Sequence, residues 1–562
     1  MELRATITPM QRFWRLLHPD RKEIRNVYVY AVFNGLINLS LPLGIQAIIN
    51  LIQGGEVSTA WIVLVSVVVI GVAVTGVLQI AQLRITENLQ QKIFARSAFE
   101  FAFRIPRVKM EAIYKHYAPE LMNRFFDTLT VQKGLPKILI DFSSAGLQVV
   151  FGLILLSFYH PFFIIFSLIL ILLVIAIFRL TGKPGLVTSL RESKYKYKVA
   201  HWLEELARIG TTFKLAGKTE LPLTRLNGEV EKYLDAREEH FKILVQQYSL
   251  MVGFKALIAA GLLAIGGILV MQQLMNIGQF VAAEIIILLI MASVEKLVMS
   301  METIYDVITA LEKIGQVTDL EIDRAEGIET ICENDNRGMT VDLKDVYFTY
   351  PDGDKEILCG ITEGFKAGES VIISGENGSG KSTLLQIIAG LYDVTKGKLI
   401  YNGLPIGNLQ LAALRSIIGD CLTQEQLFDG TVIDNITMGR EGATFENVKW
   451  AVKNLLLEDV ISGLPYGYDT VLDPQGKKLP KSTVQKLLLA RSIADKPKLL
   501  LLEDALEHMD EKERHAIIDF LLGEENDWTL VAVSSSRYFK VKADRAIEMK
   551  KGHFPNSSKS DK

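Results

Sequence analysis

The chain has 562 residues, of which 49% are hydrophobic and 22% are charged, so a soluble enzyme of ordinary composition is excluded and so is a disordered chain. Basic residues number 61 against 64 acidic residues, a net charge of −3, which excludes a globally basic nucleic-acid-binding protein. The three cysteines, Cys332, Cys359 and Cys421, have no CxxC spacing, so neither a disulfide framework nor a thiolate zinc site is supported.

The first segment, residues 1–26, is predicted to be a short helix that lies in a membrane interface. Between Met10 and Glu23 the apolar side chains of Phe13, Trp14, Leu16 and Leu17 stand among arginines and lysines. The segment lacks the long uncharged core and the small-residue cleavage site of a signal peptide.

Six apolar stretches follow, and together they predict a membrane domain over residues 27–317. Each is long enough to cross a hydrocarbon core of ~30 Å at 1.5 Å per helical residue. A single stretch of this kind can be a buried core helix, but six in succession are typical of a membrane protein. The stretches are Val27–Ile52, Thr59–Leu83, Ile138–Tyr159, Pro161–Leu180, Leu250–Gln272 and Gln279–Ser300.

The connections between these stretches differ in charge. Gln53–Ala60, the turn at His160 and Gln273–Gly278 contain no lysine or arginine, whereas residues 84–137 and 181–249 are rich in both. The positive-inside rule places the two long connections, and therefore both termini, in the cytoplasm. Because structureless loops of this length are improbable and the segments are helical in composition, we expect the membrane helices to continue into the cytoplasm.

Ionisable residues inside the last two stretches indicate a functional site by default. Lys255 and Glu295 are about equally far from the outer ends of their stretches, so they are placed to pair at one depth. Alternatively, the helices protrude and both side chains are solvated on the cytoplasmic side. Glu284, which is close to the outer loop, can simply face the outer interface.

An acidic linker, residues 318–337, separates the membrane domain from a second domain at 338–562. In this second domain, short apolar strands alternate with helical segments, the pattern of an α/β domain with a mostly parallel sheet. The predicted architecture is therefore an all-α membrane domain of six helices with long cytoplasmic extensions, followed by an α/β nucleotide-binding domain of the P-loop type.

A phosphate-binding loop supports the P-loop assignment. Residues 375–382 match G-x-x-x-x-G-K-[ST], between a buried strand and a helix. The glycines let backbone N–H groups close around phosphates at a positive helix N-terminus, Lys381 adds a charge toward the β- and γ-phosphates, and Ser382 can ligate Mg²⁺. The predicted binding residues are Gly375, Glu376, Asn377, Gly378, Ser379, Gly380, Lys381, Ser382 and Thr383.

Six membrane stretches, two long cytoplasmic loops and this domain together resemble an ATP-binding-cassette (ABC) half-transporter of the exporter type, over nearly the whole chain. The resemblance implies ATP and Mg²⁺ as cofactors. It also implies that Tyr350 stacks on adenine. Ala118–Phe125 and Ala207–Ala216 lie where the family keeps the helices that dock on the ATP-binding domain, although a generic surface helix is an alternative for each.

The signature motif of the family, Leu-Ser-Gly-Gly-Gln, is altered in this chain. An ungapped alignment whose register is fixed by Arg491 places Leu479-Pro480-Lys481-Ser482-Thr483 on it. In the family this motif closes over the γ-phosphate that the opposite subunit binds, so the resemblance assigns Pro480, Lys481 and Ser482 to the ATP site. Pro480 has neither a hydroxyl nor an N–H, but it is a good first helical residue.

Catalytic positions are altered as well. After the strand 499–502 the family has Asp-Glu, whereas this chain has Glu503 at the Mg²⁺ position and Asp504 at the general-base position. Ser535 falls on the switch histidine. The glutamine that contacts Mg²⁺ and the attacking water aligns with Thr423, with Gln424 one residue later. We interpret these changes as weakened hydrolysis with ATP binding retained.

The leading interpretation is an exporter-type transporter subunit that couples ATP binding, and slow hydrolysis, to substrate movement. The alternative is a pseudo-ATPase in which ATP binding switches a regulatory or assembly partner. The expected partners are a second half-transporter, in a homodimer or a heterodimer, the lipid bilayer and a cargo of hydrophobic or amphipathic character, with no nucleic acid. The expected location is a bacterial plasma membrane, with both termini cytoplasmic. Absence of a peptidase domain before the first stretch argues against leader processing.

Overall fold

The computed structural model describes residues 8–53, 59–114, 116–330, 338–423 and 426–555. The chain divides into two compact units. The first consists of Met1–Pro106 and His116–Leu320, and the second of Arg107–Lys115 and Glu321–Lys562. The short segment Arg107–Lys115 therefore belongs to the second unit, although the chain on both sides of it belongs to the first.

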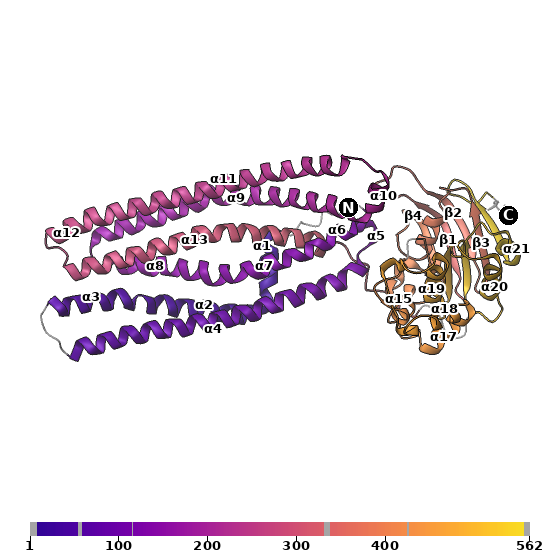
Figure 1. Ribbon diagram of the computed structural model, residues 1–562, viewed down its shortest axis with the longest axis horizontal. Helices are drawn as coiled ribbons and strands as arrows, with labels where there is room; N and C mark the ends of the chain where they lie inside the picture. Colours follow the sequence, from indigo (N-terminus) through magenta and orange to yellow (C-terminus); the bar gives the residue numbers. More distant parts are fainter. Residues whose placement is uncertain (1–7, 54–58, 115, 331–337, 424–425, 556–562) are drawn as a thin grey trace. The chain divides into compact units, whose positions relative to one another are not determined.

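Long helices make up the first unit and run side by side (Figure 1). In the described part of the chain, six helical segments are long and apolar enough to cross a membrane, which confirms the predicted six-helix membrane domain. They are α2 (Arg21–Asn38) with α3 (Ser40–Gln53), α4 (Thr59–Arg104), α7 (Asp127–Pro136) with α8 (Ser143–Ser157), α9 (Pro161–Arg208), α11 (Leu221–Gly261) with α12 (Gly267–Met271), and α13 (Ile277–Thr318).

These helices continue well beyond their apolar stretches, as expected from the sequence. α9 has 48 residues, and at 1.5 Å per residue it is about 72 Å long, more than twice the thickness of a hydrocarbon core. Its polar half is tied to α11 by ion pairs, Arg191 with Glu239 at 2.5 Å and Arg237 with Glu192 at 3.2 Å. The long polar connections of the sequence are therefore helical.

Buried polar contacts join α9, α11 and α13 where they pack. The Gln247 side chain donates to the Thr181 hydroxyl at 3.0 Å and to the Tyr305 hydroxyl at 2.7 Å, and Tyr305 donates to the Thr181 carbonyl at 3.2 Å. Gly185 lets Tyr305 approach, because a Cβ at this position would come within 2.4 Å of the ring. Hydrogen bonds of this kind hold membrane helices together without a hydrophobic driving force.

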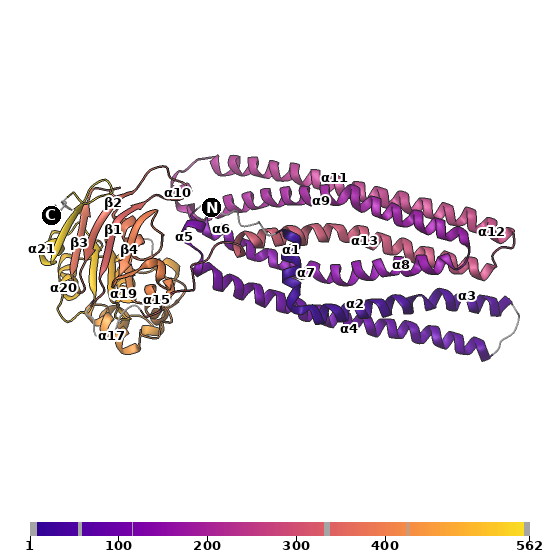
Figure 2. The ribbon, with the colours of Figure 1, turned by 180° about the vertical axis from the view of Figure 1, so that it is seen from behind.

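The N-terminal helix α1 (Pro9–Leu17) crosses the long helices instead of running along them (Figure 2). A capping box starts it: the Thr8 hydroxyl accepts from the Gln11 backbone N–H, and the Gln11 side chain accepts from the Thr8 N–H. Arg12 then forms ion pairs with Glu312 on α13 and with Asp319, the C-cap of that helix. The predicted short N-terminal helix is thus present, and it ends before His18.

Three short helices lie in the long connections: α5 (Met110–Ile113), α6 (Ala118–Met122) and α10 (Gly210–Leu215). α5 belongs to the second unit, whereas α6 and the residues after it belong to the first. The two segments thus fall in different units, and docking of Ala118–Phe125 on the ATP-binding domain stays a prediction.

Two larger sheets form the second unit. The first has the order β2-β1-β4-β5, and the second has the order β11-β3-β10-β9-β6 and is parallel throughout, as the sequence predicts. A two-stranded ribbon, β7 with β8, completes the strands of the described chain. The bounds are β1 Val341–Phe348, β2 Leu358–Phe365, β3 Ser370–Gly375, β4 Lys396–Tyr401, β5 Leu404–Pro405, β6 Ile418–Cys421, β7 Gly430–Thr431, β8 Val471–Leu472, β9 Leu499–Glu503, β10 Thr529–Val533 and β11 Arg545–Met549.

The parallel sheet is buried on both faces. Along β9, Leu499 and Leu501 join one hydrophobic core and Leu500 and Leu502 join the other, because successive side chains of a strand point to opposite faces. Helices add further residues to these cores. They are α14 Lys381–Ile388, α15 Leu411–Ser416, α16 Val432–Thr437, α17 Phe445–Asn454, α18 Glu458–Ser462, α19 Lys481–Ile493, α20 Glu511–Leu521 and α21 Arg537–Lys542.

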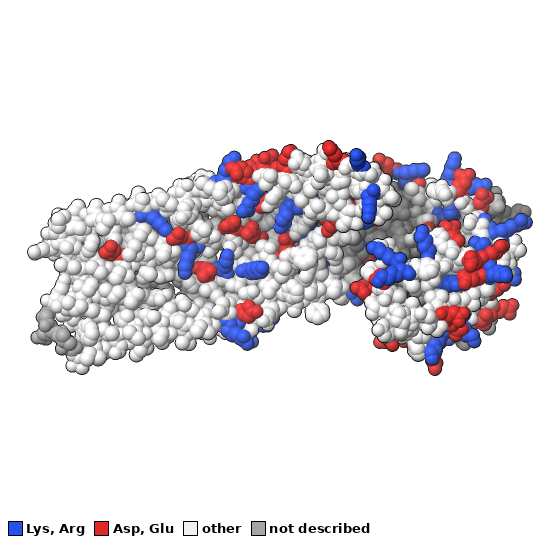
Figure 3. Space-filling model, viewed as in Figure 1, with Lys and Arg blue, Asp and Glu red and all other residues white. Residues whose placement is uncertain are grey.

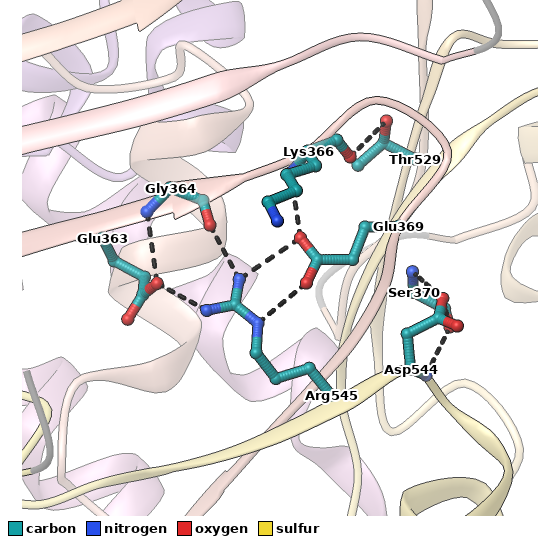
Figure 4. Close-up of polar contacts among 8 residues, drawn as sticks. All are labelled: Glu363, Gly364, Lys366, Glu369, Ser370, Thr529, Asp544 and Arg545. Atoms are coloured by element: carbon teal, nitrogen blue, oxygen red, sulfur yellow. Dashed lines mark hydrogen bonds and ion pairs between the residues drawn. The ribbon is translucent and has the colours of Figure 1, made fainter.

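A group of polar contacts ties the beginning of β11 to β2 and β3 (Figure 4). Arg545 donates to Glu363 at 2.7 Å, to Glu369 at 2.9 Å and to the Gly364 carbonyl at 2.7 Å. Beside it, the Asp544 carboxylate accepts from the Ser370 hydroxyl at 2.7 Å, and these hydrogen bonds lower the pKa of Asp544. The contacts fix the amino ends of the strands, opposite the edge at which the phosphate loop begins.

Candidate functional site

The carboxyl ends of three adjacent strands form the edge on which the candidate site is built. Ile373 of β3 pairs with Val533 of β10, and Val533 pairs with Glu503 of β9. The residues that follow these strands therefore emerge side by side: the phosphate loop after β3, Asp504 after β9 and the serines after β10. Ligands of open parallel sheets bind outside this edge.

The phosphate loop connects β3 to α14 through backbone conformations that favour glycine. Gly375 has φ of 149°, and a Cβ there would lie 2.1 Å from the carbonyl oxygen of Met549. Gly380 caps α14 with φ of 99°. The tight approach at Gly375 and the left-handed cap at Gly380 fix the course of the loop, so that helix α14 starts directly above the end of β3.

Lys381, the first residue of α14, folds back over this loop. Its ammonium donates to the carbonyl oxygens of Gly375 at 2.9 Å and Glu376 at 2.7 Å. Ser379 is buried beneath it, while Asn377 and the hydroxyl-bearing Ser382 are exposed. The Lys381 ammonium, exposed backbone and the Ser382 hydroxyl thus lie together at the N-terminus of α14. This arrangement binds phosphate groups.

Glu503 ends β9 as a buried carboxylate that is 6% exposed. Thr423 donates to it twice, from its hydroxyl at 2.5 Å and from its backbone N–H at 3.2 Å. The structure therefore brings together two residues that were aligned to separate motifs. Gln424, the alternative to Thr423 in that alignment, lies outside the described residues.

Asp504 is held in an unusual backbone conformation. Its φ is 48°, in the left-handed region, and its N–H donates to the Val533 carbonyl at 3.0 Å. Burial raises the pKa of the Asp504 carboxyl, the nearby carboxylates of Glu507 and Glu503 raise it further, and Lys381 lowers it. The structure therefore places Asp504 between the phosphate-loop lysine and two acidic neighbours.

Sequence reasoning missed Glu507. The residue lies three positions after Asp504, and its backbone N–H donates to the Asp504 carbonyl at 3.2 Å, so the chain turns tightly there. Three carboxylates within five residues, Glu503, Asp504 and Glu507, were the signal that could have identified it. The negative charge of Glu507 opposes ionisation of Asp504, the residue that is aligned to the general base.

Ser535 and Asp504 line one cavity of about 510 Å³. Ser535 follows β10 and is exposed, so its hydroxyl can reach a ligand at this edge. The same cavity is lined by Glu507, Arg514 and Arg537, among others. The residue aligned to the switch histidine is thus placed beside the residue aligned to the general base, but it carries no positive charge.

Pro480 precedes helix α19 and is not its first residue. Its ψ of 144° is extended, and the helix starts at Lys481. The prediction that proline occupies the first helical position is wrong by one residue, because the extended backbone makes Pro480 the N-cap. The helix nevertheless forms. Pro480 and Lys481 are exposed, and Ser482 is half-buried. No side chain caps the helix start in this structure.

Tyr350 lies beside the start of α14. Its hydroxyl is 3.0 Å from the hydroxyl of Thr383 and donates to the Gln386 side chain at 3.3 Å. Its ring stacks on that of Tyr114, with centroids 5.2 Å apart and an interplanar angle of 16°. Tyr114 belongs to the segment Arg107–Lys115, and no local sequence pattern pointed to it.

In the first unit, Lys255 pairs with Glu295, which is one of the two alternatives that the sequence leaves open. The Lys255 ammonium lies 2.6 Å from the Glu295 carboxylate, and the two side chains are 32% and 40% exposed. Figure 3 shows that the surface around α3 and α12 carries few charged side chains on the face in view.

Two family models match the chain. One, described as the ABC transporter transmembrane region, matches residues 25–294, and the other, described as ABC transporter, matches residues 358–507. The chain thus carries a segment similar to each of the two domains of ABC transporters. The match to the transmembrane region precedes the match to the ATP-binding domain, which is the order that the sequence predicts.

Relatives and solved structures agree with this architecture. An uncharacterized ABC transporter ATP-binding protein of Bacillus subtilis is 36% identical over 200 residues, 35% of this chain and 34% of the relative. A Staphylococcus aureus protein named as a candidate multidrug export ATP-binding/permease protein is 34% identical over 213 residues, 38% of this chain and 37% of the relative. The alignments thus span about a third of the length of these relatives.

The structure of a bacterial Atm1-family ABC exporter with ATP bound is similar to this structure over 95% of this chain and 94% of that chain. The TM-score is 0.84 and the sequence identity is 18%, so the likeness concerns the fold. It extends to both the membrane and the ATP-binding domain. The chain has the fold of an ABC exporter and is an integral membrane protein.

Proposed function

We propose that this chain is one half of an ATP-driven exporter, in which Mg-ATP bound at the phosphate loop drives the movement of a cargo across the membrane. The observation that carries the proposal is the intact loop 375–382 at the carboxyl edge of a parallel sheet, in the same chain as six membrane-length helices. In this proposal residues 27–317 form the membrane domain and residues 338–562 the ATP-binding domain. Residues 1–26 form an interfacial helix, and residues 318–337 are a linker.

The loop residues divide the recognition of ATP between them. Lys381 exchanges its carbonyl contacts for oxygens of the β- and γ-phosphates, which offer a charge-assisted partner in place of neutral ones. Backbone N–H groups from Gly375 to Thr383 surround the phosphates at the start of α14. Tyr350 stacks on the adenine.

Magnesium fits the residues at this edge. Ser382 offers an exposed hydroxyl at the start of α14, and Glu503 offers a buried carboxylate that Thr423 orients, and such oxygen ligands suit Mg²⁺. When bound, the ion neutralises phosphate charge. Thr423, with Gln424 as the alternative, would contribute at the metal and the attacking water.

Hydrolysis is proposed to be slow. Asp504 is one methylene shorter than a glutamate, which retracts its carboxylate by about 1.5 Å, and a misplacement near 1 Å can cost ~100-fold in rate. Ser535 cannot supply a cation to the γ-phosphate. Pro480 and Lys481 give the start of α19 neither a hydroxyl nor the close backbone approach that small residues allow. The degenerate positions thus affect both faces of the nucleotide site.

Assembly with a second half-transporter, identical or different, completes each nucleotide site, because the Lys381 side and the Pro480–Ser482 side belong to different chains in this arrangement. Charge asymmetry places residues 84–137, residues 181–249 and both termini on the cytoplasmic side of a bacterial plasma membrane. The apolar spans favour a hydrophobic or amphipathic cargo. A regulatory switch without transport is the less favoured alternative.

Nucleotide binding tests the proposal. Replacing Lys381 by alanine removes charge-assisted hydrogen bonds to phosphate, so the affinity of the purified chain for Mg-ATP is expected to fall roughly tenfold to a hundredfold. Lys398→Ala is the matched control, since this lysine is exposed on β4. If Lys381→Ala binds Mg-ATP as tightly as the parent, the assignment of the phosphate loop is wrong.

A further inference from the structure

Tyr350 has one ring face that is stacked and another side that is closed by the protein core. The stacked face lies against Tyr114, nearly parallel to it. Phe348 and Tyr392 contact the ring at right angles, with centroids 5.0 and 5.5 Å away. Phe348 and Tyr392 are both buried members of the hydrophobic core against which Tyr350 packs. Tyr114 therefore covers one face of the Tyr350 ring, and Phe348 and Tyr392 restrict access to the ring from the core.

Hydrogen bonds fix the orientation of this ring. The Tyr350 hydroxyl contacts Thr383 and Gln386 on α14, the helix that begins at the phosphate loop. A ring held at both its hydroxyl and its edges does not rotate freely to offer another face. A base that stacks on the face that Tyr114 covers must displace the Tyr114 ring.

Tyr114 is held at this position by the segment that carries it. Val108 forms a β-bridge with Ile322, and the Arg107 carbonyl accepts from the Asp323 N–H at 2.7 Å. Further along, the Glu111 carboxylate accepts from the Asp393 N–H at 2.8 Å. Tyr114 itself is 46% exposed, beyond these anchors, so its side chain can move while the segment stays attached.

We propose that Tyr114 belongs to the nucleotide-base subsite, as the residue that a bound purine base replaces on the face of Tyr350. The inference rests on the proposed ATP-binding function and adds a determinant of base recognition to it. Parallel aromatic rings gain interaction energy at centroid separations of 4.5–7 Å, so the Tyr114 ring and a base compete for the same contact. The competition lowers affinity for ATP and leaves affinity for a ligand without a base unchanged.

Binding of Mg-ATP and of magnesium tripolyphosphate to the full-length chain in lipid nanodiscs tests this inference. Tyr114→Ala is expected to tighten Mg-ATP binding by roughly twofold to tenfold, the factor to which one aromatic pair corresponds. Tripolyphosphate affinity should stay the same, because this ligand has no base. Tyr114→Phe keeps the ring and should match the parent. Tyr466→Ala, which removes a tyrosine that is 78% exposed elsewhere in the second unit, is the matched control.

Two outcomes overturn the inference. Tyr114→Ala with unchanged or weaker Mg-ATP binding shows that Tyr114 does not compete with the base. Equal tightening of Mg-ATP and tripolyphosphate shows a general loosening of the site. If neither the parent nor Tyr114→Ala binds Mg-ATP in a Lys381-dependent way, the proposed function itself fails, and this result is distinct from the first two.

Discussion

Replacement of Asp504 by glutamate is expected to raise ATP turnover about tenfold. The aspartate carboxylate lies about 1.5 Å short of the position that glutamate would reach, and a misplacement near 1 Å can cost ~100-fold in rate. The backbone does not make up the difference, because the Asp504 N–H is bonded to Val533 and its carbonyl to Glu507, at 3.0 and 3.2 Å. We expect Asp504→Glu to recover only part of this ~100-fold loss in rate, because Ser535 and Pro480 are unchanged and the residues act as a unit.

A cost in stability accompanies this gain. Asp504 has φ of 48°, a left-handed conformation that aspartate tolerates better than glutamate does. We expect Asp504→Glu to lower the free energy of unfolding by about 0.5–1 kcal/mol. The assay is steady-state phosphate release in lipid nanodiscs with Lys381→Ala as the blank, together with thermal unfolding of each variant.

The same assay tests whether the length of the side chain at position 504 limits hydrolysis. Addition of Ser535→His, Pro480→Ser and Lys481→Gly to Asp504→Glu should raise turnover by more than the product of the separate gains, because the effects are non-additive. A folded Asp504→Glu variant whose rate equals or falls below that of the parent would show that side-chain length at this position does not limit hydrolysis.

Three further predictions concern charge. Because Glu507 raises the pKa of Asp504, turnover should fall as the pH drops through that raised pKa, and Glu507→Gln should move this acidic limb to lower pH, measured as a pH–rate profile. Glu295→Gln leaves Lys255 without its carboxylate partner and should destabilise the membrane domain by roughly 1–3 kcal/mol, measured by thermal unfolding in lipid. A cysteine at Gln272, in a chain whose native cysteines are replaced by serine, should react with an impermeant reagent from outside the cell.

Much of the fold could be predicted from the sequence, because its signals are local. Apolar stretches of membrane length predicted the six helices, and the charged segments after them predicted helical continuations such as that of α9 to Arg208. The phosphate loop was recognisable because glycines at fixed spacing are needed for its backbone conformation. Equal depth allowed Lys255 and Glu295 to pair but did not decide between a pair and two solvated side chains, and the structure shows the pair.

The parts of the site that sequence reasoning missed depend on contacts between distant residues. Tyr114 and Tyr350 meet only because Arg107–Lys115 packs with the second unit, and no pattern near either tyrosine encodes this packing. Alignment alone also placed the helix start at Pro480 one residue too early, because this boundary has no strong local signal. The influence of Glu507 on Asp504 became visible only once the turn after β9 was known.

The rate of ATP turnover by the parent chain in lipid tests the central claim most directly. The account predicts a rate that is measurable above the Lys381→Ala blank and below about 1 s⁻¹, the lower end of ordinary enzyme turnover. A rate indistinguishable from the blank would contradict an ATP-driven exporter that consumes ATP and would favour a switch that only binds it. A rate at or above about 1 s⁻¹ would contradict the weakened hydrolysis inferred from Asp504, Ser535 and Pro480.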